Sequence, residues 1–214
     1  MSNITETLLN KIFPTTSVFT TSEVAEAADV HLSNASSRLK KLADEGMLVR
    51  VRRGLWAMPN HPDFSPYAVV PHLFDSDEDG YVSLLSALHL HGMIEQIPQV
   101  VHIMTTRRRR DLSTPVGTYE FHKIQPELYG GFEPYDRIWS FQFARPEKAL
   151  FDVCYLAQRK GKRFSHLPEL TLPDDFDQEE FISWVDRISY DRLRTAVRER
   201  AEEILEHSEV HRSS

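Results

Sequence analysis

The sequence predicts an α+β fold in which a winged helix-turn-helix is followed by a mixed α/β C-terminal domain with a small, largely antiparallel sheet. Residues 19–59 are patterned as two helices and a two-stranded hairpin, which is the element order of a winged helix. Three prolines within residues 59–66 indicate a linker. Beyond the linker, helical and alternating segments are mixed. We therefore expect one domain at residues 1–60 and a second at 61–214.

Two helices form the expected helix-turn-helix. The first spans residues 23–28, and Thr21 or Ser22 can cap it because a hydroxyl oxygen accepts hydrogen bonds from free backbone N–H groups. The second spans about 32–45, and Gly46 after it suits the left-handed conformation that ends helices. The apolar positions of the second helix lie on one face: Ala35, Leu39 and Leu42.

A hairpin completes the first domain. Apolar and polar residues alternate from Met47 onward, Arg53-Gly54 turns the chain, and residues 55–58 return as the second strand. A further helix is expected at residues 3–13, ended by Pro14, and should pack behind the other two.

Short polar and cationic side chains gather on the second helix and the hairpin. Residues 31–60 carry six basic and two acidic side chains, a net charge of +4 in a chain of net charge −7. Such residues suit a helix in the major groove with cations on phosphates. We expect double-stranded DNA to be bound by Ser33, Asn34, Ser36, Ser37, Arg38, Lys40, Lys41, Arg50, Arg52 and Arg53. The alternative is a solvated helix of a winged helix that binds protein.

The second domain alternates between strands and helices. Strands are expected at residues 99–105, 118–124 and 137–143, and helices at 67–74, 144–161, 178–188 and 190–207. Residues 81–92 are expected to form a short strand entry followed by a helix. Prolines and glycines within 126–134 should break the chain between the last two strands. Four arginines, Arg107, Arg108, Arg109 and Arg110, follow the first strand. They form either a charged loop or a second patch that contacts phosphates or a partner.

No metal site is expected from the sequence. The acidic run Asp75–Gly80 imitates the start of a calcium loop, but Ser86 occupies the place of the bidentate glutamate, so we interpret the run as a solvated turn. His89 and His91 are two residues apart on a helix and diverge, whereas zinc ligands on helices are four apart.

The sequence also predicts that the protein is not an enzyme and needs no cofactor. It contains no phosphate-binding glycine loop and no nucleophile motif. Cys154 lies in an apolar helix, where a small core residue is the favoured interpretation. Four polar residues near it could line a site, but capping and salt bridging are favoured for them: Arg145, Glu147, Lys148 and Asp152.

Residues 37–59 resemble the N-terminal domain of AbiEi-type antitoxins, from abortive-infection type IV toxin–antitoxin systems. The matching positions are Leu39, Leu42, Gly46, Arg53, Gly54, Leu55, Trp56 and Pro59. Two further segments, 81–98 and 144–156, also resemble this family, so the resemblance covers most of residues 19–160. It implies an N-terminal domain that binds inverted repeats upstream of its own operon, with contacts from Lys40, Lys41, Arg50, Arg52 and Arg53. It also implies a C-terminal domain that neutralises a nucleotidyltransferase-like toxin.

The expected function is therefore that of a DNA-binding transcriptional autorepressor and antitoxin. A winged-helix regulator whose C-terminal domain senses a ligand or partner protein is one alternative, and an adaptor that never touches DNA is another. No apolar run approaches the roughly 18 residues of a spanning helix, the N-terminus lacks a secretory pattern, and there is one cysteine. We expect a cytoplasmic monomer or weak dimer with no membrane partner.

Overall fold

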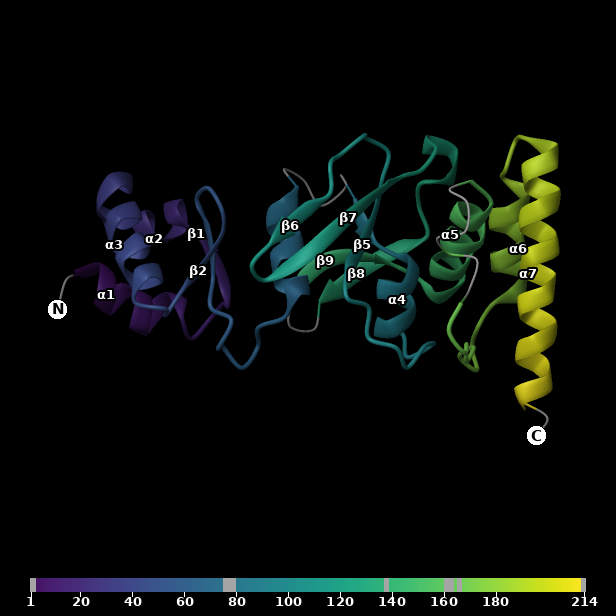
Figure 1. Cartoon of the computed structure of the whole chain (residues 1–214), viewed down its shortest axis with the longest axis horizontal. Helices are drawn as coiled ribbons and strands as arrows, with labels where there is room; N and C mark the ends of the chain where they lie inside the picture. The colour runs from purple at the N-terminus through teal and green to yellow at the C-terminus, as the bar shows by residue number, and fades with distance from the viewer. Residues whose placement is uncertain (1–2, 75–79, 137–138, 160–163, 165–166, 213–214) are drawn as a thin grey trace. The chain divides into compact units, whose positions relative to one another are not determined.

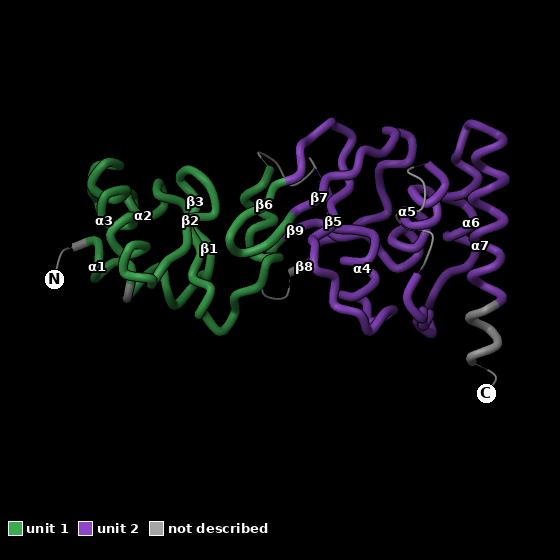
Figure 2. Tube along the Cα trace, viewed as in Figure 1, with its two compact units in different colours: residues 1–75, 112–118, 137–140 green, residues 76–111, 119–136, 141–214 purple. Residues whose placement is uncertain are grey.

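The computed structural model describes residues 3–74, 80–136, 139–159, 164 and 167–212, and it is a mixed α+β protein (Figure 1). The chain divides into two compact units (Figure 2). The first comprises Met1–Asp75, Leu112–Thr118 and Arg137–Ser140, and the second comprises Ser76–Asp111, Tyr119–Asp136 and Phe141–Ser214. A domain boundary at residues 59–66 stays a prediction.

The N-terminal part of the first unit combines short helices with a three-stranded antiparallel sheet of order β1-β3-β2. In chain order its elements are α1 (Asn3–Thr7), the π-helical turn η1 (Leu8–Ile12), β1 (Val18–Thr20), α2 (Thr21–Ala27), α3 (Leu32–Asp44), β2 (Val49–Arg52) and β3 (Leu55–Ala57). The expected helices and hairpin are therefore present. Strand β1 was not expected from the sequence, and its partner β3 lies far along the chain, with Val18 opposite Ala57.

The start of α2 differs from the prediction by one residue. Thr20, rather than Thr21 or Ser22, is the N-cap, and its hydroxyl accepts a hydrogen bond from the Glu23 N–H. The Glu23 carboxylate accepts the Thr20 N–H in return, which completes a capping box. The predicted stripe of α3 is confirmed, since its three apolar residues are at most 3% exposed: Ala35, Leu39 and Leu42. They pack with Phe19 and Trp56 in one core.

A six-stranded sheet follows, with the order β6-β7-β5-β4-β9-β8. Its strands are β4 (Tyr81–Val82), β5 (Val101–Thr105), β6 (Leu112–Thr114), β7 (Gly117–Lys123), β8 (Phe132–Asp136) and β9 (Ser140–Ala144). Strand β4 is antiparallel to β5 but parallel to β9, and β5 is parallel to β7. The sheet is therefore larger than the small one predicted, and two of its pairings, β4 with β9 and β5 with β7, are parallel.

Strand β8 shows why the sequence underestimated the sheet. The prediction counted Pro134 among the residues that break the chain between the strands at 118–124 and 137–143, yet Pro134 lies inside β8. Because β8 is an edge strand, a residue without an N–H can face away from its single neighbour without losing a ladder hydrogen bond.

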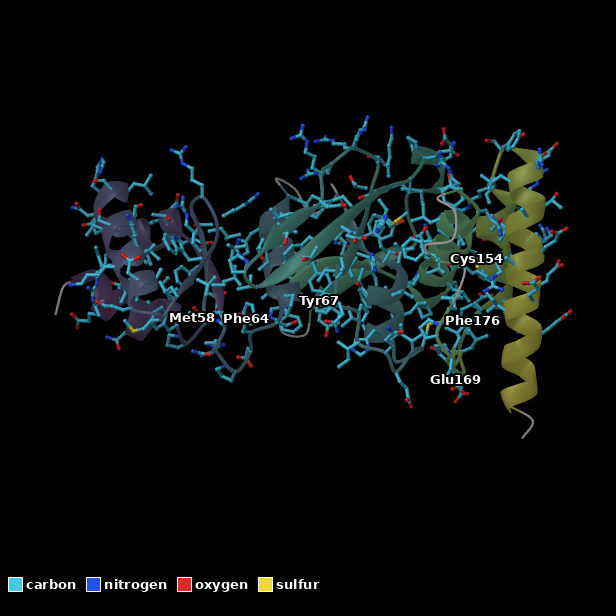
Figure 3. The ribbon with its side chains drawn as sticks, in the orientation of Figure 1. Met58, Phe64, Tyr67, Cys154, Glu169 and Phe176 are labelled. Atoms are coloured by element: carbon cyan, nitrogen blue, oxygen red, sulfur yellow. The ribbon has the colours of Figure 1, made fainter. Side chains whose placement is uncertain are left out.

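Helices complete the second unit and supply much of its core. They are α4 (Leu84–Leu90), α5 (Pro146–Arg159), α6 (Gln178–Asp186) and α7 (Asp191–Arg212), which confirms the expected helices with shifted ends. In the first unit, the segment expected as a helix at 67–74 forms the 3-10 helix η2 (Pro66–Leu73), and in the second unit η4 (Pro126–Leu128) is another 3-10 helix. Cys154 lies on α5 (Figure 3). It is buried, as predicted, and burial raises the pKa of its thiol to about 12. Among the described residues, no helix has both the length and the apolar character needed to cross a membrane.

Candidate nucleic-acid interface

Helix α3 presents a polar face opposite its buried stripe. His31 is its N-cap, and the His31 ring contacts the Ser33 hydroxyl at 2.8 Å. Six of the seven candidate residues on α3 are exposed, and Arg38 is half-buried: Ser33, Asn34, Ser36, Ser37, Arg38, Lys40 and Lys41. The helix therefore offers short hydroxyl and amide side chains together with two exposed lysines.

A groove of about 630 Å³ lies between α3 and the β2–β3 hairpin. It brings together five of the predicted residues, namely Ser33, Ser36, Lys40, Arg50 and Arg53. We call this feature the α3–hairpin groove. Its other lining residues are Thr21, Ser22, His31, Leu32, Ala43, Asp44, Gly54 and Trp56. Three permanent cations against the single carboxylate of Asp44 make the lining positive, which favours a polyanion.

The base of the groove is held by Trp56 on β3. Its ring is 4% exposed, and its indole N–H donates to the Thr21 hydroxyl at 2.9 Å. The Thr21 N–H donates to the Gly54 carbonyl at 2.8 Å, which ties α2 to the hairpin turn. Gly54 has a φ of 79°, a conformation that glycine adopts without strain. The Arg50 guanidinium lies 5.9 Å from the centre of the Trp56 ring, so the indole face positions this cation at the groove.

Five predicted residues do not line the α3–hairpin groove. The Arg38 Nε–H donates to the Thr5 hydroxyl at 3.0 Å, which fastens α3 to α1. Arg52 donates a hydrogen bond to the His72 carbonyl, so its guanidinium is used within the first unit. The Ser37 hydroxyl donates to the Ser33 carbonyl at 2.9 Å. The other two, Asn34 and Lys41, are exposed on α3 outside the groove.

The predicted second basic patch lies on the loop between β5 and β6. Arg107, Arg108 and Arg110 are exposed there, whereas Arg109 is half-buried and its guanidinium lies 6.0 Å from the centre of the Phe121 ring. The patch therefore belongs to the second unit, away along the chain from the α3–hairpin groove.

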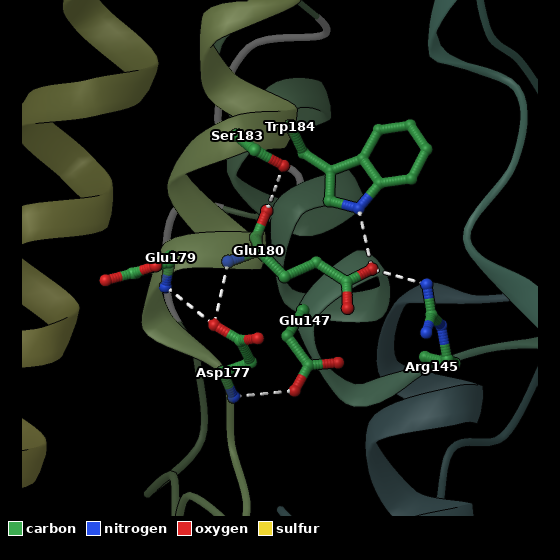
Figure 4. Close-up of polar contacts among 7 residues, drawn as sticks. All are labelled: Arg145, Glu147, Asp177, Glu179, Glu180, Ser183 and Trp184. Atoms are coloured by element: carbon green, nitrogen blue, oxygen red, sulfur yellow. Dashed lines mark hydrogen bonds and ion pairs between the residues drawn. The ribbon is translucent and has the colours of Figure 1, made fainter.

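The polar residues around the start of α5 form structural contacts. Arg145 and Glu180 form an ion pair, and the Trp184 indole N–H donates to the same carboxylate at 3.4 Å (Figure 4). Asp177 caps α6 by accepting two backbone N–H groups, while its own N–H donates to Glu147 at 2.9 Å. This network joins the starts of α5 and α6, in the capping and salt-bridging roles predicted.

Lys148 and Asp152 form an ion pair whose side chains are both 0% exposed. The other carboxylate oxygen of Asp152 accepts hydrogen bonds from the Ser83 hydroxyl at 2.7 Å and the Tyr81 hydroxyl at 3.0 Å. The Lys148 ammonium lies 4.8 Å from the centre of the Phe151 ring. Burial raises the pKa of the Asp152 carboxyl and lowers the pKa of the Lys148 ammonium, and each partner opposes part of the other's shift.

One cluster was missed by reasoning from the sequence. His102, Glu120 and His122 place their ligand atoms within 4.8 Å of one another. The prediction considered the helical pair His89 and His91, not residues on strands. Glu120 and His122 are two residues apart within a segment expected as a strand, and residues at this spacing point to the same face of a sheet. This spacing was the one indication in the sequence that the two side chains could share a metal ion.

The acidic run at 75–79, which was interpreted as a solvated turn, lies outside the described residues.

Among solved structures, the chain is similar to the crystal structure of the RV2827C protein from Mycobacterium tuberculosis. The two share 15% sequence identity with a TM-score of 0.59, and the similarity covers 97% of this chain and 76% of that chain. At this identity the similarity establishes the fold alone. No protein-family model matches the chain, and no curated protein matches it.

Proposed function

We propose that the protein is a DNA-binding transcriptional autorepressor and antitoxin of a type IV toxin–antitoxin system. The DNA-binding part rests chiefly on one observation: a helix and a hairpin share one positively lined groove. In this proposal α2 and α3 are the helix-turn-helix, the β2–β3 hairpin is the wing, and α3 enters the major groove. The order of the elements from α1 to β3 supports that assignment.

The charge of the chain also supports a division of roles. Residues 61–214 carry 18 basic and 26 acidic side chains, a net charge of −8, whereas residues 31–60 carry +4. The strongly acidic residues 61–214 repel DNA. The cations of the α3–hairpin groove all lie within residues 31–60, so this groove is the favoured docking surface.

The antitoxin part rests on the resemblance to AbiEi-type proteins. Two of the resembling segments, 81–98 and 144–156, meet within the second unit. Tyr81 and Ser83 of the first segment donate hydrogen bonds to Asp152 of the second. The His91 ring contacts the Ala144 carbonyl at 2.8 Å. The residues that carry the resemblance therefore build a shared core, which supports the proposal that they belong to one functional domain.

Replacing Ser36 by alanine should reduce sequence preference more than affinity. Ser36 is exposed and lines the groove. Its hydroxyl can make a single hydrogen bond to a base edge, worth about 0.5 to 1.5 kcal/mol. Fluorescence anisotropy on a duplex from upstream of the protein's own gene, and on a shuffled duplex, should show the ratio of the two affinities falling by roughly 2- to 12-fold.

The matched control is Ser37→Ala, one residue further along α3. The Ser37 hydroxyl donates to the Ser33 carbonyl and does not line the groove, so this change should leave the ratio nearly unaltered. An equal loss in both variants would contradict base reading by the groove. If the wild-type chain shows no preference between the two duplexes, autorepression is refuted.

The antitoxin role is tested in cells. Expressing the full chain together with a nucleotidyltransferase-like protein encoded beside it should restore the growth that the latter arrests. Groove variants that lose DNA binding should still restore growth if neutralisation belongs to the second unit. Growth arrest that persists in the presence of the folded full chain would refute the antitoxin role.

A further inference from the structure

Strands β5 and β7 of the six-stranded sheet carry a cluster of three ligand-type side chains, His102, Glu120 and His122. Strands β5 and β7 are parallel neighbours (Figure 1), and the register places His102 opposite Glu120. His122 follows Glu120 by two residues on the same strand. Because successive side chains of a strand alternate between faces, all three lie on one face of the sheet. Rigid paired strands therefore fix their relative positions.

The distances between the ligand atoms fit a metal ion. His102 Nδ1 lies 3.1 Å from His122 Nε2. Glu120 Oε2 lies 3.7 Å from His102 Nδ1 and 3.8 Å from His122 Nε2. Two ligands at roughly 2.0 to 2.1 Å from a tetrahedral zinc ion are about 3.3 Å apart. The cluster thus needs shifts of only a few tenths of an ångström to surround one ion.

The surroundings of the cluster suit binding of a cation. The side chains of His102, Glu120 and His122 are 9%, 12% and 2% exposed, and the Oε2 atom of Glu120 is itself buried, so the ligand atoms are shielded from solvent. The Phe164 ring packs edge-to-face on both imidazoles at 5.7 Å and limits their rotation. The backbone N–H of His102 donates to the Ser86 hydroxyl at 2.9 Å, which ties β5 to α4. Shielding strengthens the attraction between a carboxylate and a divalent ion.

We propose that His102, Glu120 and His122 bind a divalent transition-metal ion, zinc first of all, through two imidazole nitrogens and one carboxylate oxygen. Imidazole and carboxylate ligands suit Zn²⁺ and its first-row neighbours, whereas Ca²⁺ and Mg²⁺ prefer oxygen ligands alone. Three protein ligands leave the fourth position of a tetrahedral ion for water or another small ligand. This site does not depend on the proposed DNA binding, because all its residues lie in the second unit.

The competing explanation is a hydrogen bond between the two imidazoles. At 3.1 Å, one proton can lie between His102 Nδ1 and His122 Nε2, and Glu120 then stabilises whichever ring is protonated. A metal ion would replace that proton. The two explanations predict different numbers of Zn²⁺ ions bound per chain: one for the metal site, and none for a hydrogen-bonded imidazole pair.

The test uses the whole 214-residue chain after treatment with a chelator. Calorimetric titration with Zn²⁺ against a competing chelator should give one ion per chain. Titration with Co²⁺ should produce the intense visible absorption of a tetrahedral site. Glu120→Gln keeps the size of the side chain but removes its charge, and it should weaken Zn²⁺ binding at least about 10-fold. His102→Asn should abolish the tetrahedral Co²⁺ spectrum.

The matched control is Glu133→Gln, which removes an exposed carboxylate from β8 of the same sheet and should leave Zn²⁺ affinity unchanged. Circular dichroism verifies the fold of each variant. If His102→Asn does not fold, Glu120→Gln decides, because Glu120 has the most exposed side chain of the three. Failure of the folded wild-type chain to bind one ion overturns the proposal. The proposal is also overturned if the wild type and Glu120→Gln bind Zn²⁺ with equal affinity, because this result would indicate adventitious binding to surface histidines.

Discussion

The Lys148→Met variant is expected to have a free energy of unfolding about 3 to 5 kcal/mol lower than that of the wild-type chain. Methionine has nearly the length of lysine, so packing against Tyr81, Phe151 and Trp184 is largely kept. The loss arises because the Asp152 carboxyl, at a site with 0% exposure, no longer faces an ammonium group. It must then either carry an uncompensated buried charge or take up a proton, and both cost free energy. A loss of this size is a large fraction of the stability of an ordinary domain.

The effect of Lys148→Met should depend on pH in a defined direction. Burial already raises the pKa of Asp152, and Lys148 is the strongest group that opposes this shift. Without Lys148 the folded-state pKa rises further above the unfolded value of about 3.9. When a carboxyl has a higher pKa in the folded state than in the unfolded state, the free energy of unfolding of the protein falls as pH rises from the unfolded-state pKa to the folded-state pKa. The deficit relative to wild type should therefore be smaller at pH 5 than at pH 8.

Urea unfolding in a Trp56→Phe, Trp139→Phe background measures this deficit, because Trp184 is then the single tryptophan and reports on the second unit. Adding Asp152→Asn to Lys148→Met should restore much of the stability, since the amide is neutral and its oxygen still accepts the Tyr81 and Ser83 hydroxyls. Lys123→Met, at an exposed position of β7, is the matched control and should cost less than about 0.5 kcal/mol. If Lys148→Met were as stable as Lys123→Met, the buried pair of Lys148 and Asp152 would contribute little to the free energy of unfolding.

Local sequence patterns predicted the elements around the α3–hairpin groove. The stripe of Ala35, Leu39 and Leu42 defined the buried face of α3, and therefore its exposed face as well. Arg53-Gly54 located the hairpin turn. These features depend on residues within a few positions of one another, which is the range over which periodicity and turn chemistry operate.

Features that depend on pairing between distant segments were not predictable in this way. The three residues of β1 form a strand because β3 pairs with them. The parallel alignment of β5 with β7 places His102 beside Glu120, and periodicity within either strand contains no information on register. Arg38 and Arg52 have the charge expected of DNA contacts, but their hydrogen bonds to Thr5 and the His72 carbonyl depend on tertiary structure.

Removing the three cations of the α3–hairpin groove together should have the largest effect on DNA binding. Lys40→Ala, Arg50→Ala and Arg53→Ala in one chain are expected to lower affinity roughly 100-fold for specific and shuffled duplexes alike. The slope of log affinity against log salt concentration should fall in magnitude by roughly 2 to 3, since each phosphate contact contributes about 0.9. All three side chains are exposed, so the fold should survive.

A charge-matched control separates this groove from a general effect of net charge. Arg107→Ala, Arg108→Ala and Arg110→Ala also remove three positive charges, but from the loop between β5 and β6 in the second unit. If the α3–hairpin groove is the docking surface, this variant should keep most of its affinity and most of its salt dependence. A larger loss in the loop variant than in the groove variant would move the DNA contact to the second basic patch. Equal small losses would leave only long-range attraction between a cationic region and a polyanion, which decays within about 10 Å at 0.1 M salt and cannot select a sequence.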